Sequence, residues 1–174
     1  MNNYAYHALR NAGHIKRLHT VQTVGAHTLQ RHVYGAQVLA LVLLDGRPRA
    51  NRGAVLETLL LHDAPEVYTG DCPAPVKRKS PLLNAAYRAL EADWYQEYDI
   101  RMPVLTKLEE DIVKACDYLD LGWACVEERR LGNIGAPLES VIINVMTYLH
   151  EVDVPGLSSL VYDLSNAWRL TNVR

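Results

Sequence analysis

The chain has 174 residues, of which 49% are hydrophobic and 22% are charged, and its formal net charge at pH 7 is −2. This length suits one domain, residues 1–174, that buries a sizeable core without disulfides or a structural metal. The near-neutral charge excludes a broad basic surface for nucleic acid, so an anionic partner would have to be a small molecule held by a few placed cations.

The absence of targeting signals and the cysteine pattern indicate the compartment. No apolar run reaches the length of a transmembrane helix, and the first residues lack the basic and apolar regions of a signal peptide. The cysteines, Cys72, Cys116 and Cys125, are odd in number and lack CxxC spacing, which favours a reducing environment. We expect a soluble cytoplasmic protein with no membrane partner.

The apolar residues recur with helical periodicity nearly throughout, and no two alternating runs are joined by a hairpin signal. We therefore predict an all-α fold. Two helix starts are well marked, because Ser80 precedes a proline and Thr106 forms a capping box with Glu109. The predicted helices, in chain order, lie within 6–18, at about 27–44, over a run at 55–61, at about 81–98, from 106 toward 131, at about 137–150, and in a last segment that contains Trp168.

The segment 62–77 concentrates polar chemistry. His62 and Asp63 follow the apolar run 55–61, so an imidazole and a carboxylate arrive together at a helix end, as metal ligands do. Glu66 comes four residues after His62, one turn on if the helix continues. The prolines and glycine that follow predict a loop over the site rather than a regular helix. This segment is typical of an active site.

A second imidazole has two candidates on the predicted helix at 27–44. His32 shares a helical stripe with apolar residues such as Ala36 and Leu39, whereas His27 shares its face with Gln30 and Arg31. We therefore expect His32 to point inward as a metal ligand. The remaining histidines are expected to be surface or structural residues.

A second carboxylate is expected on the helix that begins at Thr106. Asp117 is flanked at helical spacing by Val113 and Leu121, where an unpaired charge would be costly and a metal ion would neutralise it. Asp120 is the alternative ligand in place of Asp117. If it is not a ligand, the simpler expectation is that it forms a salt bridge. We choose Asp117 and leave Asp120 open.

In order along the chain, His32, the pair His62-Asp63, and Asp117 resemble the ligand set of the HD-domain metal phosphohydrolases. Glu66 and the segments 69–71 (Thr-Gly-Asp) and 73–77 (Pro-Ala-Pro-Val-Lys) resemble the bacterial 5′-deoxynucleotidases of that superfamily. The segment 16–20 (Lys-Arg-Leu-His-Thr) and the compact length resemble more narrowly the phage dATP triphosphohydrolases of the DatZ type, from viruses that replace adenine by 2,6-diaminopurine.

The resemblance implies a single all-helical HD domain with a divalent metal ion. Two imidazoles and two carboxylates suit Zn, Co or Mn about equally, with Mg as a further possibility. Glu66 is the expected catalytic acid/base. The expected substrate-binding residues supply cations for phosphates, an acceptor for the sugar and apolar walls for a purine: Arg17, Leu18, Thr20, Asp71, Pro75, Lys77 and Lys79.

Some positions depart from the pattern of these relatives. Leu18 stands where these relatives often carry Trp, and this difference affects how the base or sugar would be bound. Arg31 and Val33, on either side of His32, stand where Glu and Ser are common. The assignment of His32 therefore depends on its distance from Arg17 and on its inward face.

We expect hydrolysis of dATP, and also of dADP and dAMP, to deoxyadenosine and the corresponding phosphate, in a host cytoplasm if the gene is phage-borne. Other interpretations are a general 5′-deoxynucleotidase acting on monophosphates, a hydrolase of guanosine tetraphosphate alarmones, and a non-enzymatic helical interaction module. A set of apolar residues near the C-terminus also predicts a homo-oligomer, and the resemblance suggests a hexamer. These residues are Ile142, Ile143, Val145, Met146, Leu149 and Trp168.

Overall fold

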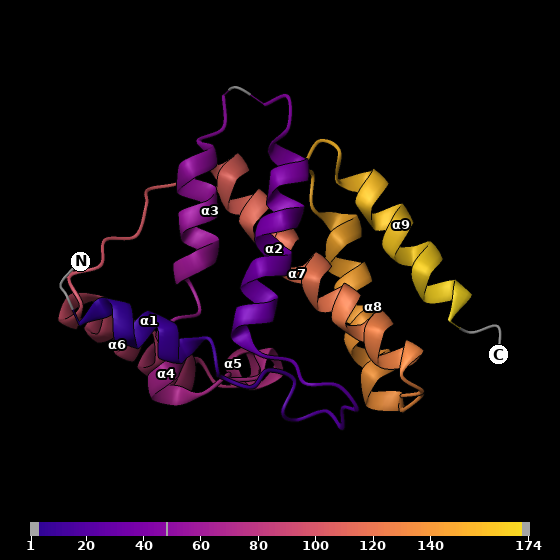
Figure 1. Cartoon of the computed structure of the whole chain (residues 1–174), viewed down its shortest axis with the longest axis horizontal. Helices are drawn as coiled ribbons and strands as arrows, with labels where there is room; N and C mark the ends of the chain where they lie inside the picture. Colours follow the sequence, from indigo (N-terminus) through magenta and orange to yellow (C-terminus); the bar gives the residue numbers. More distant parts are fainter. Residues whose placement is uncertain (1–3, 48, 172–174) are drawn as a thin grey trace.

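A computed structural model describes residues 4–47 and 49–171, and these residues form α helices and no strand (Figure 1). The all-α prediction is confirmed. One isolated antiparallel bridge joins Lys16 to Thr28. The helices are α1 (Ala5–Ala12), α2 (Leu29–Leu44), α3 (Arg52–Leu61), α4 (Glu66–Thr69), α5 (Ala74–Lys79), α6 (Pro81–Glu97), α7 (Lys107–Arg130), α8 (Ala136–Glu151) and α9 (Leu157–Leu170).

The two helix starts predicted most firmly have the expected caps. The Ser80 side chain accepts a hydrogen bond from the backbone N–H of Leu83, and Pro81 opens α6. At α7, Thr106 accepts from the N–H of Glu109, whose carboxylate in turn accepts from the N–H of Thr106. That carboxylate also accepts from the N–H of Asn51, the residue before α3, at 2.6 Å. The starts of α3 and α7 are therefore tied together.

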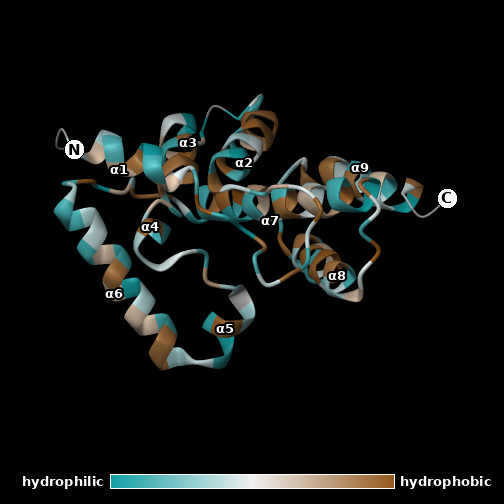
Figure 2. Ribbon diagram, turned by 60° about the horizontal axis from the view of Figure 1, so that its bottom comes forward, coloured by the Kyte–Doolittle hydropathy of each residue, from teal (hydrophilic) through white to brown (hydrophobic). Residues whose placement is uncertain are grey.

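A larger apolar core joins α2 and α3 to α7, α8 and α9, and hydrophobic residues gather where these helices meet (Figure 2). Much of the apolar set expected to drive self-association lies inside this core. Ile142 is 3% exposed, and Val145 and Leu149 are also buried, whereas Ile143 on the same helix is 63% exposed. Helices α7 and α9 of the same chain cover that face, so it gives no reason for self-association. The homo-oligomer stays a prediction.

A smaller apolar core lies beside the larger one. It joins α1, the first turns of α2, the end of α3 and the Trp94 side chain of α6. Helix α6 buries only Trp94 among its residues and extends away from the other helices toward α5 (Figure 2). Helix α2 contributes to both cores, through Leu29 and Val33 to the smaller one and through Ala36 and Leu43 to the larger one.

The segment predicted to be a loop after Glu66 contains two short helices, α4 and α5, so that prediction was wrong in part. Pro75 lies in the first turn of α5, where the backbone N–H that proline lacks would have no helical partner in any case. Gly70, with φ of +69°, ends α4. Among the described residues, no helix has both the length and the apolar character needed to cross a bilayer.

Candidate active site

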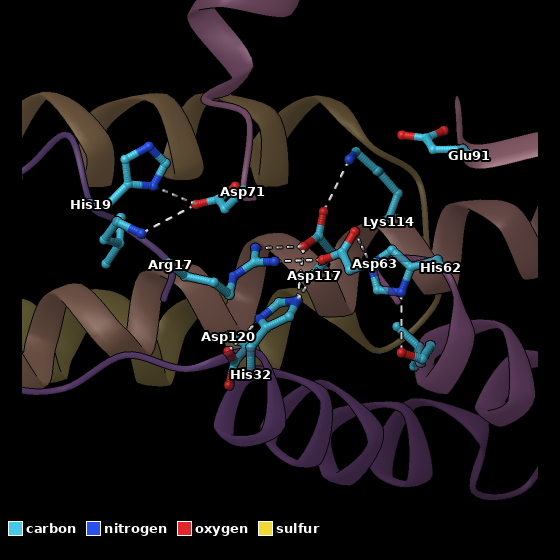
Figure 3. Close-up of polar contacts among 12 residues, drawn as sticks. Arg17, His19, His32, His62, Asp63, Asp71, Glu91, Lys114, Asp117 and Asp120 are labelled. Atoms are coloured by element: carbon cyan, nitrogen blue, oxygen red, sulfur yellow. Dashed lines mark hydrogen bonds and ion pairs between the residues drawn. The ribbon is translucent and has the colours of Figure 1, made fainter. Parts of the chain in front are cut away.

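Three segments that are far apart in the sequence bring four side chains together (Figure 3). His32 comes from α2, His62 and Asp63 follow α3, and Asp117 comes from the middle of α7. Each offers one ligand atom, and these atoms all lie within 4.8 Å of one another. The Nε2 atom of His32 lies 3.2 Å from Asp117 Oδ1 and 3.8 Å from Asp63 Oδ2. The residues expected to hold a metal ion are therefore neighbours in the structure.

The end of α3 holds the His62-Asp63 pair in place. The Nδ1 atom of His62 lies 3.1 Å from the carbonyl oxygen of Leu59, one turn earlier. The Tyr95 hydroxyl of α6 donates to the carbonyl oxygens of Leu61 and His62, at 3.1 and 3.2 Å. These bonds satisfy carbonyl groups that a helix end leaves free. The His62 ring therefore presents its Nε2 atom to the cluster.

The donor set fits a divalent cation. Among the described residues, the Nε2 atoms of His32 and His62 are buried and form no hydrogen bond. A buried nitrogen without a partner is costly unless it binds something, and both nitrogens face carboxylates. Two imidazole nitrogens with two carboxylate groups suit Zn²⁺, Co²⁺ or Mn²⁺.

Arg17 points between the two aspartates of this cluster (Figure 3). Its Nη1 atom lies 2.5 Å from Asp63 Oδ2, and its Nη2 atom lies 3.7 Å from Asp117 Oδ1. Burial alone would lower the pKa of the guanidinium. The charges of Asp63 and Asp117 outweigh burial and raise this pKa above its ordinary value. The Arg17 backbone N–H donates to the carbonyl of His27, and the following Leu18 has a left-handed φ of 57°. This turn brings Arg17 into the site.

The charges of the cluster shift its pKa values. Burial alone would raise the pKa of Asp63. The charges of His62 and Arg17 outweigh burial and lower this pKa below its ordinary value. Asp117 is likewise held well below its usual pKa, against the effect of burial, by His32 and Lys114. Burial lowers the pKa of His32, but the nearby Asp117 and Asp120 carboxylates raise it to about 9. In the absence of a metal ion, these charges therefore favour anionic Asp63 and Asp117 beside a protonated His32.

Glu66 is buried beside the cluster, with 8% of its surface exposed. Its Oε2 atom has no hydrogen-bond partner among the described residues. Burial and the charge of Asp63 raise its pKa to about 8. Helix α3 does not continue to Glu66 as the spacing suggested, because a turn at 62–65 intervenes and Glu66 opens α4. Glu66 nevertheless reaches the same region, since Arg17 and Asp71 also affect its pKa.

The other expected substrate-binding residues differ in whether polar contacts connect them to the site. Asp71 Oδ2 lies 3.3 Å from the Leu18 backbone N–H and 3.8 Å from His19 Nδ1. Lys77 lies 3.7 Å from Glu91, and its charge also acts on Glu66. The structure leaves the remaining three exposed, with no hydrogen bond or ion pair from their side chains to the cluster among the described residues: Thr20, Pro75 and Lys79.

The structure adds residues that the sequence reasoning missed or placed differently. Lys114 lies 3.0 Å from Asp117 Oδ2, and its position three residues earlier on the same helix could have signalled this contact. Asp120 lies 2.7 Å from Nδ1 of His32, outside the group of four. His27, expected to share an outward face, is buried and lies 2.8 Å from Glu128, because it precedes α2 instead of lying on it.

The fold is that of solved HD-domain phosphohydrolases. The structure is similar to the cyanophage S-2L HD phosphohydrolase DatZ bound to dA and one catalytic Zn²⁺ ion, with a TM-score of 0.73 and 20% identity over 98% of both chains. It is equally similar to an HD-domain phosphohydrolase from Listeria innocua, with a TM-score of 0.73 and 20% identity over 98% of this chain and 89% of the other.

Sequence comparison identifies the family. The pattern described as 5′-deoxynucleotidase YfbR-like matches residues 5–158. A 5′-deoxynucleotidase from Photorhabdus laumondii is 30% identical over 172 residues, covering 83% of this chain and 85% of its own. The YfbR 5′-deoxynucleotidase of Escherichia coli is also 30% identical, with 83% and 84% covered. The chain belongs to the YfbR-like 5′-deoxynucleotidase family, whose members are hydrolases that act on phosphoric esters.

Proposed function

We propose that this protein hydrolyses the 5′-phosphoester bond of deoxynucleotides with the help of a divalent cation. The observation that carries the proposal is the convergence of His32, His62, Asp63 and Asp117, with two buried Nε2 atoms that lack a hydrogen bond within residues 4–47 and 49–171. The substrate class is supported by the 5′-deoxynucleotidases to which the chain is 30% identical.

The four clustered residues would hold the cation. When bound, it supplies Lewis acidity toward a phosphate oxygen and toward water. The DatZ structure contains a catalytic Zn²⁺, which favours zinc, while the donor set also suits cobalt or manganese. The protein contributes the positions of these ligands and the neighbouring charges.

Glu66 is proposed to move the proton. With a pKa of about 8 it holds a proton at neutral pH and can give it to the leaving 5′-oxygen of the nucleoside. The positive charge of a cation at the four ligands would lower this pKa toward neutrality, the range that suits a group which both accepts and donates a proton. Its burial keeps bulk water from competing for that proton.

Three cations are proposed to contact the phosphates. Arg17 lies at the aspartates, Lys114 lies 3.0 Å from Asp117, and the charge of Lys77 reaches Glu66. A guanidinium can bind two phosphate oxygens at once, whereas an ammonium acts as a point charge. Phosphate oxygens would replace the carboxylates as partners of Arg17 when substrate binds.

A finer proposal concerns the base of the substrate. We propose a preference for adenine deoxynucleotides, dATP included, with Leu18 and Pro75 as apolar walls for the base. An apolar wall offers guanine no hydrogen-bond partner and leaves little room for a 2-amino group. Such an enzyme would remove dATP and spare a 2,6-diaminopurine nucleotide. The competing proposal, a general nucleotidase of deoxynucleoside monophosphates, is favoured by the 30% identical relatives.

A hydrolysis panel tests these proposals. The purified protein is assayed on dATP, dADP, dAMP, dGTP, dGMP, ATP and the diaminopurine deoxynucleotide, each with Zn²⁺, Co²⁺, Mn²⁺ or Mg²⁺. Release of deoxyadenosine and triphosphate from dATP supports the finer proposal. Hydrolysis of both dAMP and dGMP, but of no di- or triphosphate, would instead support the general nucleotidase. Failure on every substrate, by protein that contains metal, would refute hydrolysis of 5′-deoxynucleotides.

A further inference from the structure

The ring of His32 lies between two carboxylates from one helix (Figure 3). Asp117 Oδ1 lies 3.2 Å from its Nε2 atom, and Asp120 Oδ2 lies 2.7 Å from its Nδ1 atom. The two aspartates are three residues apart on α7, so both face α2. Because a carboxylate only accepts hydrogen bonds, the short contact means that Nδ1 of His32 donates to Asp120.

Asp120 reaches His32 across a residue that has no side chain. Gly35 lies on α2, three residues after His32, and a Cβ atom there would stand 1.9 Å from Asp120 Oδ1 and 2.9 Å from its Cγ. Gly35 is not one of the residues with positive φ, so its backbone conformation does not require glycine. A glycine inside a helix is unfavourable relative to alanine. The space it leaves is filled by the Asp120 carboxylate.

We propose that Asp120, lying against Gly35, is the positioning residue that keeps the proton of neutral His32 on Nδ1 and leaves the Nε2 lone pair for the metal ion. A neutral imidazole carries one N–H, and a fixed acceptor at Nδ1 decides which nitrogen keeps it. The buried Nε2 atom of His32, which forms no hydrogen bond among the described residues, then faces the other three ligands. This inference rests on the proposed metal-dependent function.

The second histidine shows the same arrangement with a different acceptor. Nδ1 of His62 lies 3.1 Å from the backbone carbonyl of Leu59, which a side-chain substitution cannot remove. Asp120 is therefore the acceptor that mutation can test. It lies on the Nδ1 side of His32, away from the group formed with Asp117, which separates positioning from direct ligation.

The experiment measures metal binding directly. Metal-free wild type and the Asp120→Ala, Asp120→Asn and Gly35→Ala variants are titrated with Co²⁺, and the visible absorption bands report affinity and ligand geometry. Asp120→Ala should weaken Co²⁺ binding by about 10- to 100-fold, the loss typical of removing such a partner. Asp120→Asn keeps an oxygen acceptor and should restore most of the affinity. Gly35→Ala should weaken binding because its methyl group displaces Asp120.

The double variant tests whether Gly35 acts through Asp120. In an Asp120→Ala background, Gly35→Ala should cost no further affinity, because no carboxylate remains to be displaced. Two controls leave the pair intact. Gly53→Ala adds a methyl group on α3, where the nearest atom is an Asn51 oxygen at 3.5 Å, and Asp111→Ala removes the partner of the exposed Lys107 on α7. Both should bind Co²⁺ as wild type does.

Three outcomes are decisive. If Asp120→Ala binds Co²⁺ with wild-type affinity and spectrum, Asp120 does not position His32, even if the variant melts at a lower temperature. If Gly35→Ala binds normally while Asp120→Ala does not, Gly35 is not part of the arrangement. If wild type binds no divalent metal, the proposed function fails first and this inference fails with it.

Discussion

Arg17 lies where the proposed metal ion and a substrate phosphate would both bind. Its guanidinium lies 2.5 Å from Asp63, a carboxylate that the cation would also use. Both the cation and the guanidinium are positive, so a bound cation would weaken the attraction between Arg17 and the two aspartates. The freed guanidinium is then available for a phosphate. Metal binding and phosphate binding are therefore expected to reinforce each other.

Metal binding should release protons from His32. Its pKa of about 9 means that it holds a proton at neutral pH, whereas a ligand nitrogen must be unprotonated. The apparent affinity for Zn²⁺ should therefore increase as the pH rises from 6 to 9. Calorimetry at pH 7 in buffers of different ionisation enthalpy counts the protons released. A count near zero would show that His32 is already neutral or does not bind the metal.

Replacing Glu66 separates chemistry from binding. Glu66→Gln keeps the shape of the side chain, so metal content and nucleotide affinity should change little, while turnover falls by about 10²- to 10⁴-fold. Steady-state kinetics and metal analysis on the same preparation measure this. Glu57→Gln, an exposed glutamate on α3, is the control. Near-normal turnover of Glu66→Gln would transfer the role to another carboxylate, with Asp71 as the nearest candidate.

Glu66 should also affect stability in a pH-dependent way. Its pKa is raised from 4.5 to about 8 in the folded protein, so between these values the unfolded chain loses the proton first. The free energy of unfolding should therefore decrease as the pH rises from about 5 to 8. Urea unfolding of the metal-free protein should show this slope in wild type and a smaller slope in Glu66→Gln. Equal slopes would contradict the raised pKa.

At the scale of elements, a buried carboxylate fixes the segment that brings Arg17 into the site. Glu128 on α7 is fully buried and accepts from the N–H groups of Val24 and Gly25, both at 2.7 Å, and from Asn133 at 2.9 Å. His27, whose carbonyl accepts from the Arg17 N–H, lies 2.8 Å from the same carboxylate. The loop between α1 and α2 is therefore anchored to the end of α7.

Glu128→Gln should destabilise the protein by about 1.5–3 kcal/mol, because hydrogen bonds to a charged group are lost. Burial raises the pKa of Glu128, but its donors outweigh burial and lower the pKa from 4.5 to about 2. The stabilisation is therefore complete above about pH 4.5 and lost as the pH falls toward 2. The gap in unfolding free energy between wild type and variant should shrink over that range. If this difference in unfolding free energy does not change with pH, the charge of Glu128 is not its source.

Sequence reasoning worked where local chemistry decides the structure. The caps at Ser80 and Thr106 depend on residues three positions away, so they could be predicted. The short helices α4 and α5 could not, because the prolines and glycine in and around them also suit a loop. His27 was misplaced because its burial depends on Glu128, 101 residues later in the chain. No local pattern carries such a contact.

At the scale of the whole molecule, the order and helical faces of the four candidate ligands were enough to expect them together. The contact of Asp120 with His32 required the crossing of α2 and α7, which periodicity does not give. The exposure of Ile142, Val145 and Leu149 on α8 was misjudged for the same reason, since only the packing of α7 and α9 shows that these three are covered.

A metal ion at this site would connect α2, the end of α3 and α7. A ligand that binds only the folded state at 100 times its dissociation constant adds about 2.7 kcal/mol, or roughly 5–10 °C in melting temperature for a chain of this size. Calorimetric scans with and without Zn²⁺ should show this increase, and His62→Ala should abolish it. An unchanged melting temperature for wild type would mean that the metal does not bind these helices.

The division of the apolar residues into two cores has a consequence for local unfolding. Arg17 lies in the chain between α1 and α2, and Glu66 follows the end of α3, both next to the smaller core, whereas Asp117 belongs to a helix of the larger one. Cooperative units of different stability exchange their amide hydrogens at different rates. The amides of α1 and α6 should therefore exchange faster than those of α7. Transient opening of the smaller unit would separate Glu66, the proposed proton donor, from Asp117 on α7, and we expect hydrolysis to stop while the larger unit stays folded.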